Sequence, residues 1–346
     1  MARKHLLMPL LALALLAGAC GGGSDPAADD EPAAGTGTTE EAAAGEETEE
    51  EGSDWPDKLV LGFVPSREAD VLVENVKPLE AALSEALGIT VESFVSQDYT
   101  GLVEAMASGQ ADVGAFGPLG LVRAEERAGV EVILQSERFG SLTYHTQYFT
   151  NNPDKYCLDE PQADEDGNLH CNGTLDASEG PAGADTLASI EAGTTLAYVD
   201  PTSTSGYLIP ALQMQEAGVD LASLESVFAG GHDSAVLAVY NGDVEVGMSF
   251  DDARGIVAGE HADVGEKVVV FAYSEEIPND GIAVRGDLPD DLKEAITQAF
   301  VDYAATDEGK EVLNSIYEID NLVPADGSVF DVVRRADEAL GDTISD

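Results

Sequence analysis

Segments typical of buried strands alternate with segments typical of helices along most of the chain, and this alternation constrains the fold more than any other feature of the sequence. The apolar run 59–65 is followed by residues 67–87, in which leucine and valine recur every three or four positions until Gly88 ends the pattern. Repeated strand–helix units place their strands in parallel and their helices on both faces of a sheet. The sequence therefore predicts an α/β fold with mostly parallel sheets.

The chain also contains an internal echo at a constant offset of 133 positions, which aligns residues 99–115 with residues 232–248. Both segments show a helix, a glycine, an acidic residue and a Val-Gly strand in that order, with Tyr99 and His232 at the same place. Ordinary repetition of strand–helix units can also produce such an echo. If it is structural, the chain forms two similar lobes around a ligand cleft, because open α/β sheets bind ligands at the carboxyl ends of their strands.

The first 54 residues are expected to lie outside the folded part. A short basic segment and the apolar run 6–17 precede small residues and Cys20, which is typical of a secretory signal. The pattern resembles a bacterial lipobox, which implies cleavage before Cys20 and lipid attachment to its sulfur. The alternative is an ordinary signal peptide with an incidental cysteine. Residues 21–54 are acidic and contain no large apolar residue, as expected for a disordered tether.

The two remaining cysteines are Cys157 and Cys171. An even pair in an exported protein favours a disulfide, which would close a loop of about 15 residues and contribute roughly 3 kcal/mol in the chain-entropy model. The acidic stretch 164–168 in this loop does not match EF-hand spacing, so we predict no metal and no cofactor. The expected parts are a signal peptide (1–19), a lipidated cysteine with a disordered acidic tether (20–54), a first lobe (55–147 and 273–346) and a second lobe (148–272) that carries the Cys157–Cys171 loop as an insertion.

The charge of the chain restricts its partners. It has 67 acidic and 16 basic residues and a net charge of −51. This excess argues against nucleic acid and anionic lipid head groups as partners. An anionic ligand would be repelled at long range, with screening beyond roughly 10 Å at 0.1 M salt. We therefore expect any anion site to work through short-range neutral donors.

Residues 200–211, DPTSTSGYLIPA, place Ser203, Thr204 and Ser205 at the predicted start of a helix. Hydroxyl groups beside a helix N-terminus can hold an anion. The alternative is that one hydroxyl only caps the helix. On this stretch alone the two interpretations are equally supported.

The same stretch, together with DYTGLVEAM, FGPLG, GGHDSAVLAV and IPNDGIAVR in that order, resembles the substrate-binding proteins of phosphonate, phosphite and phosphate ABC transporters. The resemblance covers about residues 58–320. It implies a two-lobed, type II-like periplasmic-binding-protein fold that closes on a phosphorus oxyanion and delivers it to a membrane permease. We expect a monomer without enzymatic activity, held by its lipid on the outer face of the cytoplasmic membrane.

The resemblance also implies a set of ligand contacts. Hydroxyl and backbone groups of the stretch 203–205 would bind the phosphorus oxygens, His232 would donate to another oxygen, and Tyr99 would donate from the opposite lobe. Tyr144 and Thr146 match an aromatic residue and a hydroxyl residue that lie near the cleft in the family. The expected ligand-binding residues are Tyr99, Phe116, Tyr144, Thr146, Ser203, Thr204, Ser205, His232, Asp252 and Asp280.

Three of these residues bear on which anion binds. Asp280 matches a family acid that accepts from a P–OH group or a ligand amine, so sulfate, which carries no proton near neutral pH, should bind poorly. Asp252 lies near a second acid seen in aminophosphonate binders, with Asp251 as its rival. Phe116 replaces a tyrosine of some members, which removes one polar donor.

Other functions are compatible with parts of the sequence. The same fold could bind a thiamine precursor or an organic acid. Ser203 or Ser205 could form a hydrolase dyad with His232, but the G-x-S-x-G motif is absent. A metal-dependent surface protein would need a ligand cluster with recognisable spacing, and the sequence has none. Structural roles also remain open, namely capping by His232, packing by Tyr99 and a surface position for Asp280.

Overall fold

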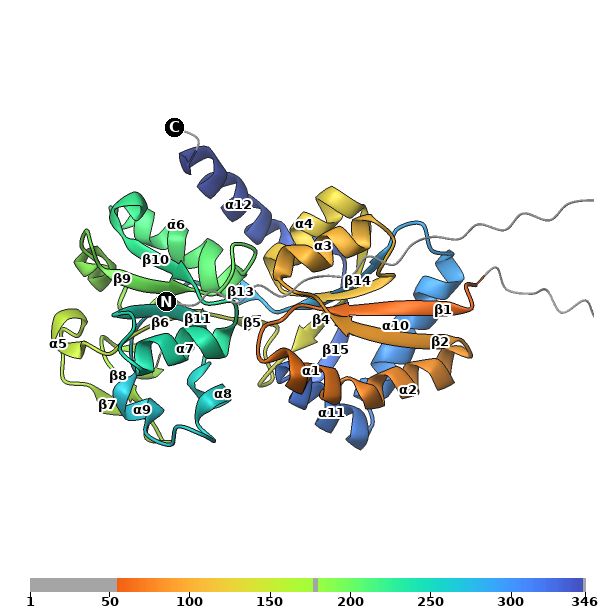
Figure 1. Cartoon of the computed structure of the whole chain (residues 1–346), viewed down its shortest axis with the longest axis horizontal. Helices are drawn as coiled ribbons and strands as arrows, with labels where there is room; N and C mark the ends of the chain where they lie inside the picture. The colour runs from red at the N-terminus through yellow and green to blue at the C-terminus, as the bar shows by residue number, and fades with distance from the viewer. Residues whose placement is uncertain (1–54, 177–179, 345–346) are drawn as a thin grey trace, which may run out of the picture. The chain divides into compact units, whose positions relative to one another are not determined.

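The computed structural model describes residues 55–176 and 180–344, and within them the chain forms two mixed β-sheets with flanking helices (Figure 1). The predicted signal peptide, Cys20 and the acidic tether lie outside the described residues. No helix in the described part is long and apolar enough to cross a membrane. The predicted α/β fold is confirmed, but the expectation of mostly parallel sheets is wrong, because both sheets mix parallel and antiparallel pairings.

The first sheet has the strand order β15-β4-β14-β3-β1-β2. Strand β1 pairs in parallel with β2 and β3, whereas β14 runs antiparallel between β3 and β4. Its strands are β1 (Lys58–Phe63), β2 (Thr90–Val95), β3 (Val113–Phe116), β4 (Val130–Glu137), β14 (Gly281–Arg285) and β15 (Asn321–Pro324). Its helices are α1 (Ala69–Asn75), α2 (Lys77–Leu87), α3 (Tyr99–Ala107), α4 (Pro118–Ala128), α10 (Asp290–Ala304) and α11 (Asp307–Tyr317).

The second sheet has the order β10-β9-β11-β6-β12-β8-β7, in which β6 runs antiparallel to both β11 and β12. Its strands are β6 (Thr146–Thr150), β7 (Gln162–Ala163), β8 (Leu169–His170), β9 (Thr195–Tyr198), β10 (Glu225–Phe228), β11 (Val246–Phe250) and β12 (Val269–Tyr273). Its helices are α5 (Pro153–Tyr156), α6 (Ile209–Glu216), α7 (His232–Tyr240), α8 (Arg254–Val257) and α9 (Val264–Lys267).

The internal echo is structural. Helices α3 and α7 begin at Tyr99 and His232 and each has nine residues, so they match residue for residue at the offset found in the sequence. The glycines that follow them, Gly109 and Gly242, both adopt a left-handed conformation, with φ of 70° and 78°. The strands that come next, β3 and β11, are buried along their whole length. The two sheets therefore repeat one helix–strand unit.

In its described part the chain crosses between the two sheets twice, and the two crossing segments pair as a short ribbon. The ribbon formed by β5 (Thr143–Tyr144) and β13 (Ile277–Pro278) is antiparallel. Helix α12 (Asp331–Ile344) packs against α4 of the first sheet and α6 of the second (Figure 1).

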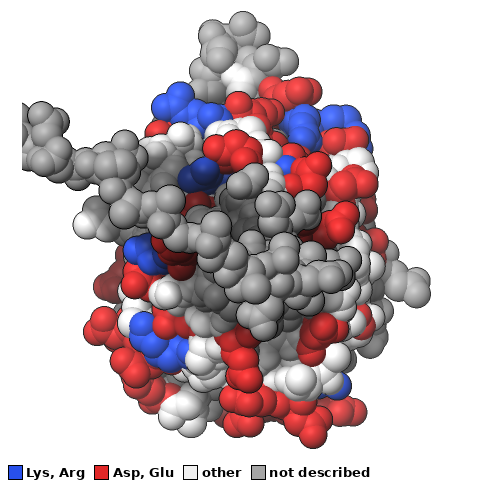
Figure 2. Space-filling model, turned by 90° about the vertical axis from the view of Figure 1, so that its right-hand side faces the viewer, with Lys and Arg blue, Asp and Glu red and all other residues white. Residues whose placement is uncertain are grey.

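A disulfide joins Cys157 and Cys171, as the cysteine count predicts. Cys171 is buried in a core cluster beneath the second sheet, where the rings of Tyr156 and Phe271 stack. The bond therefore attaches the acidic loop to the core of that sheet. Acidic side chains are spread over the face of the molecule seen in Figure 2, with fewer basic ones among them.

Candidate ligand-binding site

A cavity of about 40 Å³ lies where loops from the two sheets meet. It receives Arg67 from the loop after β1, Arg138 from the end of β4, and Asp280 from the turn before β14. The second sheet contributes the start of α7 and the end of β11. The cavity is lined by Ser66, Arg67, Arg138, Tyr144, Ser205, His232, Phe250, Asp280 and Tyr317. Four of the sequence-predicted residues, Tyr144, Ser205, His232 and Asp280, are thus brought together.

The three predicted hydroxyls have three different positions. Ser203 caps the helical segment that follows, because its Oγ accepts from the backbone N–H of Gly206 at 3.1 Å. Thr204 Oγ1 accepts from the backbone N–H of Leu119 at the start of α4, at 2.8 Å. Ser205 lines the cavity. Ser203 therefore acts as the cap, whereas Ser205 has the position that the site interpretation requires.

The segment begins with a π-helical turn, Thr204–Leu208, and continues as α6. Pro210 has no N–H to bond the carbonyl of Gly206, and the N–H of Val199 bonds that carbonyl instead, at 3.0 Å. A Cβ atom at Gly206 would collide with the side chain of Val199. Glycine is thus required for the turn to pack against β9, and this contact fixes the position of Ser205.

Two arginines at the cavity, Arg67 and Arg138, are not among the residues predicted from the sequence. Arg138 Nη2 lies 2.6 Å from Glu318 Oε2, and Arg67 Nη2 lies 3.7 Å from Glu318 Oε1. The Nε atoms of both arginines are buried and have no hydrogen-bond partner among the described residues. Arg67, Arg138 and Glu318 together carry one positive charge, which Asp280 in the cavity wall balances when it is ionised.

Asp280 and His232 titrate abnormally at this site. Burial raises the pKa of Asp280 from its usual 3.8 to about 6, although Arg138 and Arg67 act in the opposite direction. Burial and the same two arginines lower the pKa of His232 to about 3. The imidazole is therefore neutral near pH 7, and its Nδ1 lies 2.7 Å from Ser249 Oγ. Asp280 can exchange a proton near neutral pH, whereas His232 cannot.

Tyrosines complete the surroundings of the cavity. The hydroxyl of Tyr99 is buried without a hydrogen-bond partner, and burial raises the pKa of Tyr99, with contributions from Tyr317 and from the carboxylates of Asp200 and Asp280. Burial also raises the pKa of Tyr144 and of Tyr317. These phenols stay protonated, and the hydroxyl of Tyr317 donates to the carbonyl of Val64 at 2.7 Å.

The other predicted residues lie elsewhere. Thr146 is buried in β6 and donates through Oγ1 to the carbonyl of Ser205 at 3.1 Å, so it positions the turn. Phe116 is buried at the end of β3, in an apolar region that adjoins Asp280. Asp252 and its rival Asp251 line a separate cavity of about 420 Å³, which shares Arg138 and Tyr144 with the small one.

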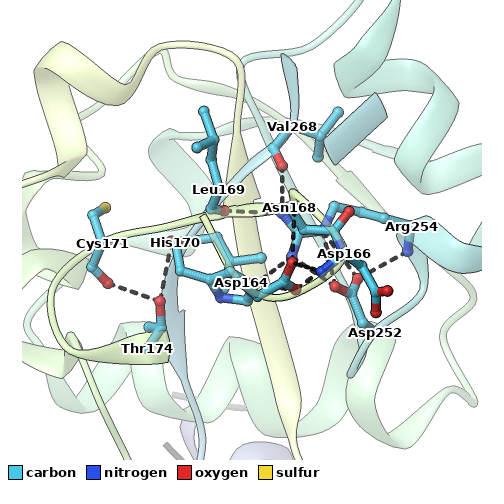
Figure 3. A network of polar contacts seen from close by, with 11 residues as sticks. Asp164, Asp166, Asn168, Leu169, His170, Cys171, Thr174, Asp252, Arg254 and Val268 are labelled. Atoms are coloured by element: carbon cyan, nitrogen blue, oxygen red, sulfur yellow. Dashed lines mark hydrogen bonds and ion pairs between the residues drawn. The ribbon is translucent and has the colours of Figure 1, made fainter. Parts of the chain in front are cut away.

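Asp252 belongs to a polar network (Figure 3). Asp164, His170 and Asp252 bring potential metal-ligand atoms within 4.8 Å of one another. Arg254 lies among them, because its Nη2 is 2.6 Å from Asp252 Oδ2 and 2.8 Å from His170 Nε2. Arg254 also donates to two backbone carbonyls. The guanidinium supplies the positive charge that a metal would bring, so we describe the cluster as an ion-pair network that holds the disulfide loop on the second sheet.

The geometry of a small, donor-rich anion cavity between two α/β sheets agrees with the comparison to known proteins. Residues 61–330 match the family model described as ABC transporter, phosphonate, periplasmic substrate-binding protein. The chain belongs to this family. The family resemblance found in the sequence is thereby confirmed, and so is the expectation of a binding protein rather than an enzyme.

Similar proteins include two curated members of known name. The chain is 32% identical over 209 residues to the phosphate-import protein PhnD of Mycolicibacterium smegmatis, and the match covers 57% of this chain and 56% of that protein. It is 25% identical over 260 residues to the phosphonates-binding periplasmic protein of Escherichia coli, with coverage of 75% and 70%. The chain thus aligns with little more than half of the mycobacterial protein.

Solved structures of phosphonate-binding proteins share the fold. PhnD1 from Prochlorococcus marinus, in complex with methylphosphonate, gives a TM-score of 0.69 at 16% identity and covers 82% of this chain and 98% of its own. A binding-protein component of an ABC phosphonate transporter from Pseudomonas aeruginosa gives 0.68 at 20% identity, with coverage of 82% and 86%.

A signal for the missed arginines was present in the sequence. Arg67 follows strand β1 after three residues, and Arg138 follows β4 directly. Ligands of open α/β sheets bind at the carboxyl ends of strands. Basic residues are rare in this chain, so two of them at such ends were candidates for an anion site.

Proposed function

We propose that the protein captures a phosphorus oxyanion in the 40 Å³ cavity and delivers it to the permease of an ABC importer. The observation that carries this proposal is the convergence of Arg67 and Arg138 with Asp280, His232 and Ser205 on one small cavity. Buried guanidinium groups are strong and geometrically selective partners for phosphorus oxygens. The two similar proteins named above, a phosphate-import protein and a phosphonates-binding protein, support the same ligand class.

In this proposal each group has a defined task. The arginines balance the charge of the anion, and Ser205 donates its hydroxyl to one oxygen. If Ser249 donates to His232 Nδ1, the neutral imidazole donates from Nε2. Asp280 accepts from a P–OH group, or donates when it is itself protonated. Tyr99 supplies a phenol whose hydroxyl is otherwise unsatisfied.

Capture would occur by closure of the two halves around the cavity. The described conformation already has hydrogen bonds between them, from the N–H of His232 to the carbonyl of Ser66 at 2.9 Å and from the N–H of Leu119 to Thr204. A ligand that contacts both halves favours the closed state, because only that state makes all the contacts. The lipid at Cys20, the monomeric state and the permease partner belong to this proposal.

Isothermal titration tests this function. The purified protein is titrated with phosphate, phosphite, methylphosphonate and 2-aminoethylphosphonate, and we expect tight binding of at least one of them. Arg138→Gln should weaken that binding about 10- to 100-fold, as expected for loss of a charge-assisted hydrogen bond. Arg335→Gln, at an exposed position of α12, is the matched control and should bind like the native protein. Unchanged binding by Arg138→Gln would contradict the proposal.

A further inference from the structure

Glu318 is not part of the cavity wall, yet its carboxylate contacts both arginines of the cavity. It follows the last residue of α11 and adopts a left-handed conformation with φ of 59° and ψ of 33°. Glycine is the least strained residue at such a helix end. A glutamate at this position, with its carboxylate between two guanidinium groups, indicates a role for the side chain.

The charges at the site can be counted from the described residues. Arg67 and Arg138 are positive, Glu318 is negative, and His232 is neutral because burial lowers its pKa to about 3. These groups together carry one positive charge. With Asp280 ionised the empty site is neutral, and with Asp280 protonated it has a charge of plus one. A bound dianion would give the site a charge of minus two when Asp280 is ionised and of minus one when Asp280 is protonated.

Two further acids lie near the cavity and must be included. The charge of Asp200 contributes to the raised pKa of Tyr99. The charge of Asp251 contributes to the raised pKa of Tyr144 and interacts with that of Arg138. Each accepts a backbone hydrogen bond, from Thr202 and from His145 respectively. Both add negative potential, and the whole chain has a net charge of −51. An additional uncompensated negative charge in the cavity is therefore disfavoured.

We propose that Glu318 is a positioning residue that sets the charge state of the bound ligand. It neutralises one of the two arginines, so that a dianion binds only together with one proton, held by Asp280 or by the anion itself. A monoanion binds without taking up a proton. This inference rests on the proposed function, because it requires an oxyanion in the same cavity.

Sulfate is the probe, because it carries no proton near neutral pH, and phosphate verifies that the site works. For the native protein we expect sulfate affinity to fall about tenfold per pH unit from pH 7 to pH 9, since each binding event needs one proton. Glu318→Gln removes the negative charge and keeps the size of the side chain. We expect sulfate to bind to this variant about tenfold or more tightly than to the native protein at pH 8, with a fall of less than about threefold per pH unit.

Two control variants separate charge from other effects. Glu311→Gln makes the same charge change at an exposed position of the same helix and should keep the native pH dependence. Glu318→Asp keeps the charge and should keep the native slope, even if the shorter side chain changes the affinity. Thermal unfolding verifies that each variant is folded.

The outcomes distinguish the two proposals. If the native protein binds none of phosphate, phosphite, methylphosphonate and 2-aminoethylphosphonate at pH 6, the proposed function is wrong. If phosphate binds but Glu318→Gln keeps the tenfold fall in sulfate affinity per pH unit, or Glu311→Gln loses it equally, the proposed function stands and the role of Glu318 is wrong.

Discussion

At the scale of single residues, Asp280 is the group at the cavity whose titration bears most directly on stability. Its pKa rises from 3.8 to about 6 because it is buried beside apolar side chains such as Phe116. A carboxyl group with a raised pKa in the folded state stabilises the protein at low pH and loses this contribution as pH rises through the folded pKa. The difference between 3.8 and about 6 corresponds to about 3 kcal/mol.

Asp280→Asn should remove this pH-dependent term. We expect the native protein to lose about 3 kcal/mol of unfolding free energy relative to Asp280→Asn when the pH rises from 4 to 7. The variant is therefore favoured at pH 7. Urea titrations at several pH values measure it. The comparison must be between variants, because the lowered pKa of His232 makes the native protein more stable as pH rises over part of the same range. Asp243→Asn, at an exposed site, should show no such change.

At this scale the structure brings together some of the residues predicted from the sequence and places others apart. The hydroxyl stretch pointed to Ser205, and the acid in IPND pointed to Asp280, and both line the cavity. Asp252 is equally acidic, but Arg254 holds it in another network. The arginines were missed because the net charge of the chain was treated as uniform, whereas Arg67 and Arg138 are concentrated at one point.

At the scale of elements, the turn before α6 depends on one glycine. Gly206→Ala would push a Cβ against Val199 and move Ser205. We expect a loss of about 1–3 kcal/mol in unfolding free energy, the usual cost of overpacking, together with weaker oxyanion binding. Gly255→Ala in α8 is the control, because a Cβ there meets nothing within 4 Å. Denaturant unfolding measures the change. If Gly206→Ala is as stable as the native protein, the turn relaxes around the new Cβ atom and this prediction is wrong.

The elements themselves were largely predictable, with two informative exceptions. The helix predicted over 67–87 is split at Val76, because Pro78 has no N–H for the carbonyl four residues earlier. Helix α11 was not recognised as a separate element, although the Tyr317 that ends it lines the cavity. The internal echo, in contrast, predicted that α3 and α7 correspond, and each helix is followed closely by a glycine with positive φ.

At the scale of the whole molecule, one hydroxyl joins the two halves. Thr202 Oγ1 lies 3.0 Å from Thr100 Oγ1 and also accepts from Arg123 Nη1 at 3.0 Å. Thr202→Val keeps the shape and removes both bonds. We expect about 3- to 10-fold weaker ligand binding through a smaller closed population, measured by titration, and a larger radius of gyration without ligand in small-angle scattering. Thr90→Val, at an exposed position of β2, should change neither quantity, and equal effects in both variants would exclude this role.

The acidic surface seen in Figure 2 has a consequence for the kinetics of ligand encounter. An anion must cross a field of its own sign before it meets the two arginines, so its association rate should rise as added salt shortens the range of that field. For partners of opposite charge, in contrast, added salt lowers the association rate. Such a protein cannot gain affinity through fast arrival, and its affinity must come from slow release. Retention of the anion, rather than its attraction from solution, then becomes the property that closure and the buried arginines serve.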